Sequence, residues 1–556
     1  MSDKKWNERV VIFFLIAVIF LFLIIEVLLN LTPPTSRDAL IHHLAIPKLW
    51  LLHGGMYEIP WADFSYYPMN IDLLYLVPLS FGNDIIPKFI HLFFGIGTGL
   101  LIYWYLGNRF GKPWGLLGFL IFFSTPLIVH LSTTAYVDLG MAFFTTASIL
   151  AFIRWREEGY QSTKWLILSA LCMGLAAGSK YNALIAWFFL NAMIVFYHSK
   201  DTGKGLPALK SGVMFFVVTL LIVSPWYIKN YILTGNPLYP LFDHFFKLLP
   251  QVGSEESGLA VHVEHNWASN IFQRRTAMFG ETIWETLLIP IRMFFQGKDA
   301  SPRYFDGVLN PIFIVMIPFA FLKNTVPRHM IFFLLFSLFF FLMAYFLTVV
   351  RVRYILPIIP ILTILTVTGM KNIVDRIPVH PDALRQAGLL GMSTAIIIFL
   401  SMNVMYLKNY VHIIKPFQFI RGQETREAFL SRHEGSYPAM RYINENLPQE
   451  SRILLMFLGR RGYYLDRSYR HDPSFGMTKL SDMVKASEER ITFLTYLRSL
   501  NCTHVLIRID MFNKYLHDNY PKETIARFLF CMKEYWNPVY GLNGYAVYKL
   551  SLGSGT

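Results

Sequence analysis

The sequence predicts an α-helical polytopic membrane protein with a small α/β domain at its C-terminal end. Only 15% of the 556 residues are charged, whereas soluble domains carry roughly 25%. The mean hydropathy is +0.41. Many apolar runs approach the roughly 20 residues that a helix needs to cross a bilayer. The chain beyond residue 406 lacks such runs and alternates short helical and strand patterns. This composition, with three cysteines, excludes a disordered chain and a disulfide scaffold.

The apolar runs predict about eleven membrane spans, because each is long enough or nearly long enough to cross. They lie near residues 10–31, 86–107, 114–131, 137–153, 166–179, 183–198, 212–225, 308–322, 329–350, 354–370 and 387–406.

Positive charge in alternate short loops predicts the topology. The basic loops carry Lys4, Lys5, Arg9, Arg109, Lys112, Arg154, Arg156, Lys164, Lys200, Lys204, Lys210, Lys323, Arg328, Lys371, Arg376 and Arg385. Short loops rich in Lys and Arg stay in the cytoplasm, so the N-terminus is expected there. An odd number of spans then places the C-terminus outside. The net charge of +14 is therefore a topology signal rather than a sign of nucleic-acid binding.

Three outer segments follow from this topology, at about 32–85, 226–306 and 407–556. We therefore expect a transmembrane domain over 1–406 and a soluble outer domain over 407–556. The soluble domain contains a helix in YPAMRYINENLP and strands in SRILLMFLG, THVLIRID and LNGYAVYKL. Cys502 and Cys531 lie in it; a disulfide would need an oxidising compartment, and unpaired buried thiols are the commoner state.

The first outer segment begins with TPPTSRDALIHHLAIPKLW. Ser36 can cap a helix over about 37–51, which would put Asp38 and His42 on one face. Asp38 then has two interpretations. It stabilises the helix dipole, or it is a general base or metal ligand at the membrane boundary. Asp138 opens the fourth span, and an ionisable group at the edge of a bundle is a functional candidate. The two carboxylates would together form one site.

Three cations break the positive-inside pattern. Lys180 lies in AAGSKYNAL, and Arg351 and Arg353 lie in TVVRVRYILP, all on the expected outer side. They either snorkel to lipid headgroups or form a cationic pocket for a phosphate at membrane depth, for which Arg provides a bidentate fork.

Support for a metal or nucleotide cofactor is weak. HVEH at 262–265 has no helical spacing between its histidines, and the first outer segment lacks an Asp-x-Asp pair. A divalent ion is a candidate cofactor on this basis alone. Walker A, Rossmann and HExxH motifs are missing from the sequence, which argues against ATP-driven transport, nucleotide cofactors and zincin chemistry.

Several stretches resemble the GT-C superfamily of integral-membrane glycosyltransferases, on the side of the protein mannosyltransferases and aminoarabinose transferases. They are DALIHHLAIPKL with YYPMN, AYVDLGMAFF, SPWYIKNYILTGNPLYPLF, RVRYILPIIP and, in the tail, NENLPQESRILLMFLGRRGYYLDRSY. The resemblance implies a polyprenyl-phosphate-linked sugar as donor, an acceptor outside the cytoplasm and a bacterial inner membrane.

The resemblance also implies roles for individual residues. Asp38 takes the place of the catalytic base, in the single-carboxylate pattern because Arg37 precedes it. Asp138 takes the second acidic position, where it orients the acceptor or binds a metal. The lipid-phosphate role falls to Lys180, Arg351 and Arg353. Further candidates for substrate contact are His42, His43, Tyr67 and Tyr354. A single displacement would invert the anomeric configuration.

Three other functions remain open on the sequence. A transporter or flippase would explain the spans and the cationic pocket, but it predicts ionisable residues deep in the spans, and Glu26 is one of few. A non-catalytic scaffold would tolerate replacement of the outer charged residues. A ligase or polymerase would use a diphosphate-linked oligosaccharide instead of one sugar.

Overall fold

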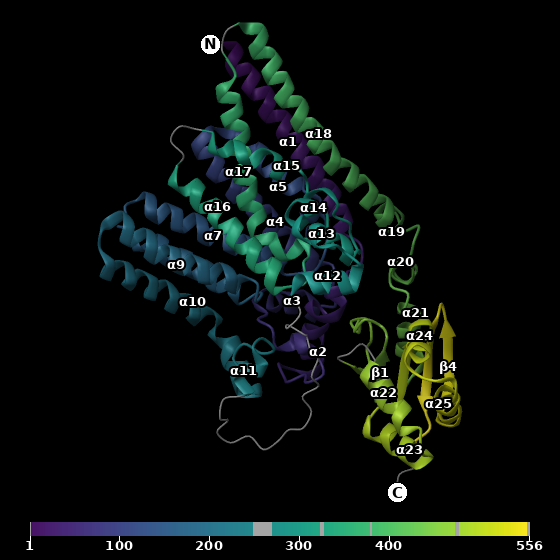
Figure 1. Cartoon of the computed structure of the whole chain (residues 1–556). Helices are drawn as coiled ribbons and strands as arrows, with labels where there is room; N and C mark the ends of the chain where they lie inside the picture. Colours follow the sequence, from purple (N-terminus) through teal and green to yellow (C-terminus); the bar gives the residue numbers. More distant parts are fainter. Residues whose placement is uncertain (1, 248–269, 323–326, 379–380, 473–476, 553–556) are drawn as a thin grey trace.

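The computed structural model describes residues 2–247, 270–322, 327–378, 381–472 and 477–552. A helical bundle makes up most of the molecule, and a smaller sheet domain lies beside one end of it (Figure 1). The HVEH stretch at 262–265 and Lys323 fall outside the described residues.

The first part of the chain is helical throughout. Its elements are α1 (Ser2–Asn30), the π-helical turn η1 (Ala39–His43), α2 (Ala45–His53), η2 (Asp63–Tyr66), α3 (Asn70–Ser80), α4 (Ile86–Phe110), α5 (Lys112–Ser124), α6 (Pro126–Ser132), α7 (Asp138–Glu157), α8 (Thr163–Ala177), α9 (Ala183–Thr202) and α10 (Gly205–Thr234).

The middle part combines short helices with three long ones. Its elements are α11 (Asp243–Lys247), α12 (Ile271–Phe279), α13 (Ile283–Leu287), α14 (Ile289–Phe295), η3 (Pro302–Tyr304), α15 (Ile312–Met316), η4 (Ile317–Phe321), α16 (Arg328–Leu347), η5 (Val352–Ile358), α17 (Ile359–Arg376) and α18 (Asp382–Ile414).

Each of the eleven predicted spans forms a helix or a pair of helices, but a count of eleven spans is not confirmed. Among the described residues, seven helices are long and apolar enough to cross a membrane. The pair α5 and α6, bent by 68°, would make an eighth. Other predicted spans are short: α8 has 15 residues, or about 22 Å at the helical rise per residue.

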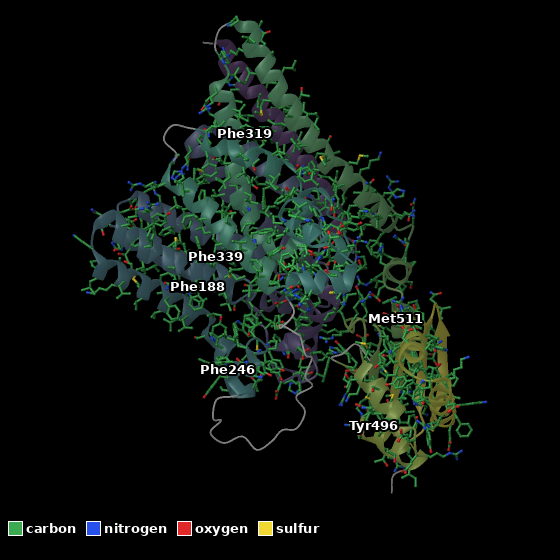
Figure 2. The ribbon with its side chains drawn as sticks, in the orientation of Figure 1. Phe188, Phe246, Phe319, Phe339, Tyr496 and Met511 are labelled. Atoms are coloured by element: carbon green, nitrogen blue, oxygen red, sulfur yellow. The ribbon has the colours of Figure 1, made fainter. Side chains whose placement is uncertain are left out.

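Burial separates the central helix from the outer ones. The most apolar window of α17, counted with η5, is 89% buried, against 17% for α1 and 11% for α18. A helix that is apolar on all sides belongs in a core or in lipid, so α17 is the core of the bundle and the other two are its lipid-facing edge. Phe188 of α9 and Phe339 of α16 stack at 6.2 Å, and Phe188 is 69% exposed where lipid would cover it (Figure 2).

The two ends of the bundle differ in charge. At one end, which we call the basic end, Asp201 of α9 lies 2.7 Å from Arg156 of α7 and 3.2 Å from Arg328 of α16. These ion pairs bring three of the basic loops together. The opposite end, which we call the site end, contains Asp138 at the start of α7 and Lys180 just before α9. Ion pairs thus place the basic loops together, away from the proposed site.

The tail forms a five-stranded mixed sheet flanked by helices. Its strands are β1 (Arg452–Met456), β2 (Ser468–His471), β3 (His504–Arg508), β4 (Trp536–Leu542) and β5 (Tyr545–Leu550), in the order β2-β1-β3-β5-β4. Its helices are α19 (Pro416–Ile420), α20 (Arg426–His433), α21 (Tyr437–Asn446), α22 (Met477–Ala486), α23 (Arg490–Ser499), α24 (Ile509–Asn519) and α25 (Lys522–Tyr535). β1 pairs in parallel with β2 and β3, while β5 pairs antiparallel with β3 and β4.

The two faces of this sheet have different partners. One face packs on α22 to α25 through residues such as Leu454 and Val505. The other buries Ile453 and Leu455 against α21, with Trp61 of the first outer segment packed on the same cluster. Each buried Ile or Leu contributes about 1.5–3 kcal/mol. Apolar packing therefore helps to hold the tail domain against the bundle. Cys172, Cys502 and Cys531 are buried and unpaired.

Candidate functional site

The first outer segment enters the site through a π-helical turn rather than the continuous helix over 37–51 that the sequence suggested. In η1 the Leu44 N–H donates to the carbonyl of Ala39 at 2.9 Å, a spacing of five residues. Asp38 is the residue before this turn, and its side chain caps no helix. The wider turn brings both His42 and His43 into electrostatic contact with Asp38. The sequence predicted only the first of these neighbours. Single π turns are frequent at functional sites.

Asp38 forms an ion pair with Arg353, which comes much later in the sequence. Its Oδ2 lies 2.5 Å from Nη1 of Arg353, and its backbone N–H donates to the Tyr136 hydroxyl at 3.2 Å. Burial opposes ionisation of Asp38, but the charge and hydrogen bond of Arg353, together with smaller contributions from His42 and His43, outweigh it and hold the pKa of the carboxyl well below its usual range. Asp38 is therefore ionised and is a weak base while Arg353 stays in place.

Asp138 forms a second ion pair beside the first. Its side chain is fully buried, and Oδ1 lies 2.6 Å from Nζ of Lys180. Within the described residues its other oxygen, Oδ2, is buried without a hydrogen-bond partner. Arg353 also interacts electrostatically with this carboxylate, so the two acidic residues share a cationic neighbour. The structure thus brings Asp38 and Asp138 into one cluster.

The three cations that the sequence singled out converge on Tyr354. Nζ of Lys180 lies 5.9 Å from the centre of its ring, Arg351 lies 5.9 Å away and Arg353 lies 5.4 Å away. The aromatic face favours cations at these distances. Arg351 differs from the other two because it pairs with Asp306, at 3.6 Å, rather than with Asp38 or Asp138. Tyr354 is thus the common neighbour of all three.

The remaining predicted contacts, His42, His43 and Tyr67, also have defined neighbours. Nδ1 of His43 lies 2.7 Å from Oδ1 of Asp72, which is itself buried. His42 stacks on Phe64 with ring centres 4.3 Å apart. Burial lowers the pKa of both histidines, that of His43 to about 3, so both are neutral at physiological pH. The Tyr67 hydroxyl interacts electrostatically with the Tyr354 hydroxyl.

Several buried polar atoms of the charged cluster make no hydrogen bond within the described residues. Within the described residues, Nε of Arg351 and of Arg353, Nδ1 of His42 and Oδ2 of Asp138 are all buried without hydrogen-bond partners. Buried polar atoms in native proteins are almost always satisfied. Four such atoms in one cluster, with both donors and acceptors among them, fit a polar ligand. The residues described here bring no three His, Cys, Asp or Glu side chains together in a metal-binding group.

The arrangement of the bundle and tail matches solved membrane proteins along the whole chain. ArnT from Cupriavidus metallidurans superposes with a TM-score of 0.54 at 14% identity, covering 100% of both chains. The same protein bound to undecaprenyl phosphate gives 0.53 at 13% identity, covering 98% of this chain and 99% of that one. The oligosaccharyltransferase of Archaeoglobus fulgidus, solved with Zn and sulfate, gives 0.54 at 12%, covering 96% and 73%. The chain has a GT-C fold.

Sequence comparisons agree with the GT-C fold over part of the chain. Residues 62–236 match the sequence model of the dolichyl-phosphate-mannose-protein mannosyltransferases. An uncharacterized protein of Shigella flexneri is 28% identical over 147 residues, which are 26% of this chain and 71% of that protein.

In this GT-C fold the tail domain contacts the segment that carries Asp38. The N–H groups of Gly462 and Tyr463 face the carbonyl of Leu40 in η1, each at 3.3 Å. The Tyr464 hydroxyl donates to the carbonyl of Pro34 at 2.6 Å. The turn from Arg460 to Tyr464 therefore supports the segment that carries Asp38.

Sequence reasoning missed two groups that position the carboxylates. His91 of α4 accepts the N–H of Leu139 on Nε2 at 2.9 Å, while Nδ1 lies 2.8 Å and 3.0 Å from the carbonyls of Leu131 and Thr134. Nδ1 must carry the proton, because carbonyls only accept. His91 thereby fixes the first turn of α7, where Asp138 lies. Tyr136, two residues before Asp138, lies in the AYVDLG stretch that marked the site.

Proposed function

We propose that this chain is a GT-C-type glycosyltransferase that moves a sugar from a polyprenyl phosphate to an acceptor outside the cytoplasm. The observation that carries the proposal is the cluster at the site end, where three cations surround Tyr354 beside two carboxylates. The solved ArnT structure with undecaprenyl phosphate supports a lipid phosphate as the leaving group. The mannosyltransferase match over 62–236 supports a sugar as the transferred group.

The proposed donor site uses Lys180, Arg351 and Arg353. Each is partly exposed, with 17%, 25% and 14% of its side chain accessible, so a phosphate can reach them. Arg–phosphate pairs form charge-assisted, bidentate hydrogen bonds. Fixed positive charge of this kind stabilises negative charge that develops on a departing phosphate. Tyr67, Tyr354, His42 and His43 line the same cluster and are proposed substrate contacts.

The proposed reaction is a single displacement. The acceptor oxygen or nitrogen bonds to the anomeric carbon as the bond from that carbon to the phosphate oxygen breaks. The polyprenyl phosphate leaves with the electron pair, and the acceptor proton passes to Asp38. Attack opposite the leaving group inverts the anomeric configuration. Asp138, with one oxygen unpartnered, is proposed to orient the acceptor.

The ion pairs link donor binding to the strength of the base. Arg353 pairs with Asp38 at 2.5 Å and keeps it a weak base. A donor phosphate competes for the same guanidinium, so its binding draws Arg353 away and raises the pKa of Asp38. A carboxylate nearer to its ordinary pKa accepts a proton more readily. Base activation would thus follow donor binding and limit proton transfer in its absence.

We propose that the site end faces the periplasm of a bacterial inner membrane and that the N-terminus is cytoplasmic. The basic end brings together Arg156 and Arg328 around Asp201, and short basic loops remain inside. On this account residues 1–406 form the catalytic membrane domain and residues 407–556 the outer domain. α18 crosses that boundary and continues to Ile414.

Reconstitution with defined donors tests this function. Purified protein in vesicles receives a panel of labelled undecaprenyl-phosphate sugars and membrane extract as acceptor, with and without EDTA. Release of undecaprenyl phosphate is expected from at least one donor. A diphosphate-linked oligosaccharide is tested as a separate donor. Release of undecaprenyl diphosphate from it, with no release from any monophosphate donor, would replace the proposal with a ligase. Movement of intact lipid across the bilayer without release would replace it with a flippase, and inactivity in both assays would favour a scaffold.

A further inference from the structure

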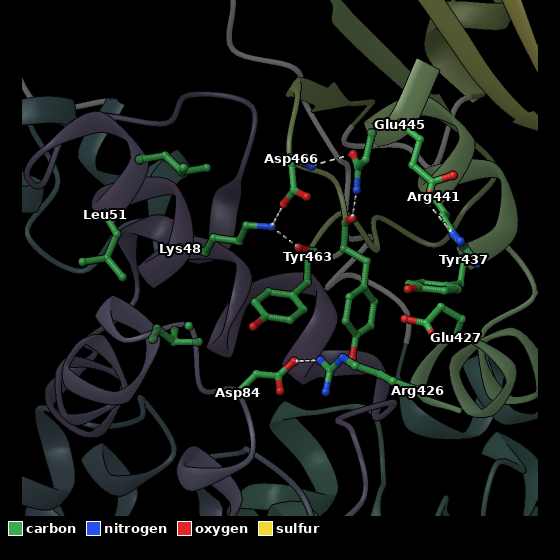
Figure 3. A pocket seen from close by; sticks show the side chains of 15 residues that line it. Lys48, Leu51, Asp84, Arg426, Glu427, Tyr437, Arg441, Glu445, Tyr463 and Asp466 are labelled. Carbon is green, nitrogen blue, oxygen red and sulfur yellow. Dashed lines mark hydrogen bonds and ion pairs between the residues drawn. The ribbon is translucent and has the colours of Figure 1, made fainter. Parts of the chain in front are cut away.

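A cleft of about 670 Å³ lies where the tail domain meets the first outer segment. Figure 3 shows Lys48 and Leu51 on one side and Tyr437, Arg441 and Glu445 on the other. It is separate from the ion-pair cluster, because neither carboxylate of that cluster lines it. A volume of this size accommodates a ligand of a few sugar rings or a short peptide.

Three cations and four carboxylates line the cleft, and each cation pairs with one of the carboxylates. Lys48 lies 2.7 Å from Asp466 and also donates to the carbonyls of Tyr463 and Leu465. Arg426 pairs with Asp84, and Arg441 lies 2.7 Å from Glu445 (Figure 3). Glu427 is the fourth carboxylate, so the lining has one more negative than positive charge. A phosphate would meet no excess of positive charge here, and the cleft therefore favours an uncharged ligand.

The polar wall combines aromatic rings with donors and acceptors. Tyr464 packs against Tyr437 at 5.3 Å and against Tyr463 at 5.0 Å. Tyrosine provides an apolar face together with a hydroxyl. A saccharide has the complementary surface, with apolar C–H faces and hydroxyl groups that both donate and accept. The carboxylates accept hydrogen bonds and the guanidinium groups donate them, so the wall can bind hydroxyl groups in both senses.

The other rim of the cleft is apolar. It is formed by Leu51, Leu52 and Leu79, and Leu52 is 65% exposed. Phe81, two residues beyond Leu79, is 83% exposed. Leu79 and Phe81 lie just before α4, one of the helices long and apolar enough to span, which would bring this rim close to the lipid. A ligand with a polar head and an apolar tail fits both rims.

The cleft also shares a loop with the catalytic segment. Tyr463 and Tyr464 line it, and the same residues bind the carbonyls of Leu40 and Pro34 on either side of Asp38. A ligand in the cleft would thus lie against the loop that supports the proposed base.

We infer that this cleft binds the uncharged saccharide head of a membrane glycolipid. Its role as the acceptor rests on the proposed function, whereas the binding itself does not. The headgroup lies among Tyr437, Tyr463, Arg441 and Glu445. The lipid chain extends across the apolar rim formed by the leucines.

Hydrogen exchange on the full-length protein in lipid nanodiscs tests the inference. The probe is dodecyl maltoside below its micellar concentration, which has an uncharged disaccharide head and one alkyl chain. It is expected to slow exchange saturably in α2, α21 and residues 460–466. Dodecylphosphocholine, with the same chain and a phosphate head, is expected to leave these segments unchanged. Equal protection by both detergents, or none by the maltoside, would overturn the inference.

Two substitutions in α21 test whether the maltoside binds in this cleft. Tyr437→Ala removes a ring that faces the cleft, and the half-saturating maltoside concentration should rise at least tenfold. Tyr442→Ala is the matched control, because Tyr442 packs on Tyr540 at 4.6 Å and does not line the cleft; it should bind as the wild type does. Equal weakening in both variants would contradict the site. A neutral Ser–Asn–Gly hexapeptide that protects these segments when the maltoside does not would instead identify a peptide site.

This experiment is independent of the proposed function. Saturable binding with no donor turnover would leave the saccharide site intact and overturn the glycosyltransferase proposal. Donor turnover without maltoside binding would overturn the saccharide site alone.

Discussion

The carboxylate of Asp38 and the guanidinium of Arg353 lie 2.5 Å apart, so the proposed base is paired with a proposed phosphate ligand. Asp138 and Lys180 repeat this relationship at 2.6 Å. Each acidic residue of the site is thus neutralised by a cation that the donor would need. The site is preorganised in charge, and a donor phosphate would redistribute the pairing. This relationship determines most of the predictions.

The pH dependence of turnover should reveal how far Arg353 lowers the pKa of Asp38. The guanidinium holds the pKa of Asp38 well below its usual range, so wild-type kcat/KM should not fall through Asp38 protonation until well below about pH 4. Arg353→Gln leaves burial as the dominant effect, which raises the pKa. Its acid limb should move above about pH 4 and so into the measured range, where wild-type kcat/KM is flat. Undecaprenyl phosphate release between pH 4 and 8 measures this.

Arg470→Gln is the control, because Arg470 is exposed on β2. It should retain the wild-type limb. An identical limb in Arg353→Gln and wild type would show that Arg353 does not set the ionisation of the base.

The Lys180–Asp138 pair should behave as a coupled unit in stability. Lys180→Met leaves Asp138 buried and unpaired, which costs about 3–5 kcal/mol in comparable buried pairs. Adding Asp138→Asn removes the uncompensated charge and should restore most of that loss, without restoring turnover. Thermal unfolding in detergent gives Tm for the four members of the cycle. A double variant as unstable as the sum of the singles would exclude this coupling.

His91 should act as a positioning residue for Asp138. His91→Phe removes the acceptor for the Leu139 N–H and the donor to Leu131 and Thr134. A buried group left unsatisfied costs about 1–3 kcal/mol. We expect kcat to fall about tenfold or more with donor KM nearly unchanged, since no phosphate ligand is altered. His517→Phe, at an exposed position, should leave both constants unchanged. A rise in KM alone would argue against positioning.

The tail domain should stabilise the segment that carries Asp38. Tyr464→Phe removes only the hydroxyl that donates to Pro34, a bond that contributes about 0.5–1.5 kcal/mol. Amide exchange in residues 34–44 should become faster, while the sheet itself is unaffected. Tyr442→Phe provides the comparison on the same domain. Unchanged exchange in 34–44 would mean that the loop contact does not support the segment.

The site residues could be singled out from sequence because charge is conspicuous at a membrane edge. Asp38, Asp138 and Lys180 interrupt apolar runs, and Arg351 and Arg353 break the charge pattern of the loops. Their pairing could not be foreseen, since partners as distant as Asp38 and Arg353 meet only through tertiary structure. The π turn at 39–43 was hidden for a related reason: no sequence signal separates it from an ordinary helix.

The tail shows a similar limit. β1 and β3 were predicted because they are buried apolar runs, with burial on nearly every residue. β2 and β4 were missed because SYRH is polar and WNPVYGL contains Pro538. Both lie at the edges of the sheet, where polar residues and proline are tolerated. The number of spans was uncertain for a geometric reason, since several helices are short for a bilayer.

The most direct test of the account compares Asp38→Asn with Asp518→Asn in the reconstituted assay. The first change keeps the shape of the proposed base but removes its charge; the second alters an exposed aspartate of α24. With an active undecaprenyl-phosphate sugar and acceptor, release of undecaprenyl phosphate should fall by about 10²–10⁴-fold in Asp38→Asn, the range general-base catalysis supplies, and stay at the wild-type rate in Asp518→Asn. Near-normal release by correctly folded, membrane-inserted Asp38→Asn protein would contradict the assignment of Asp38 as the base.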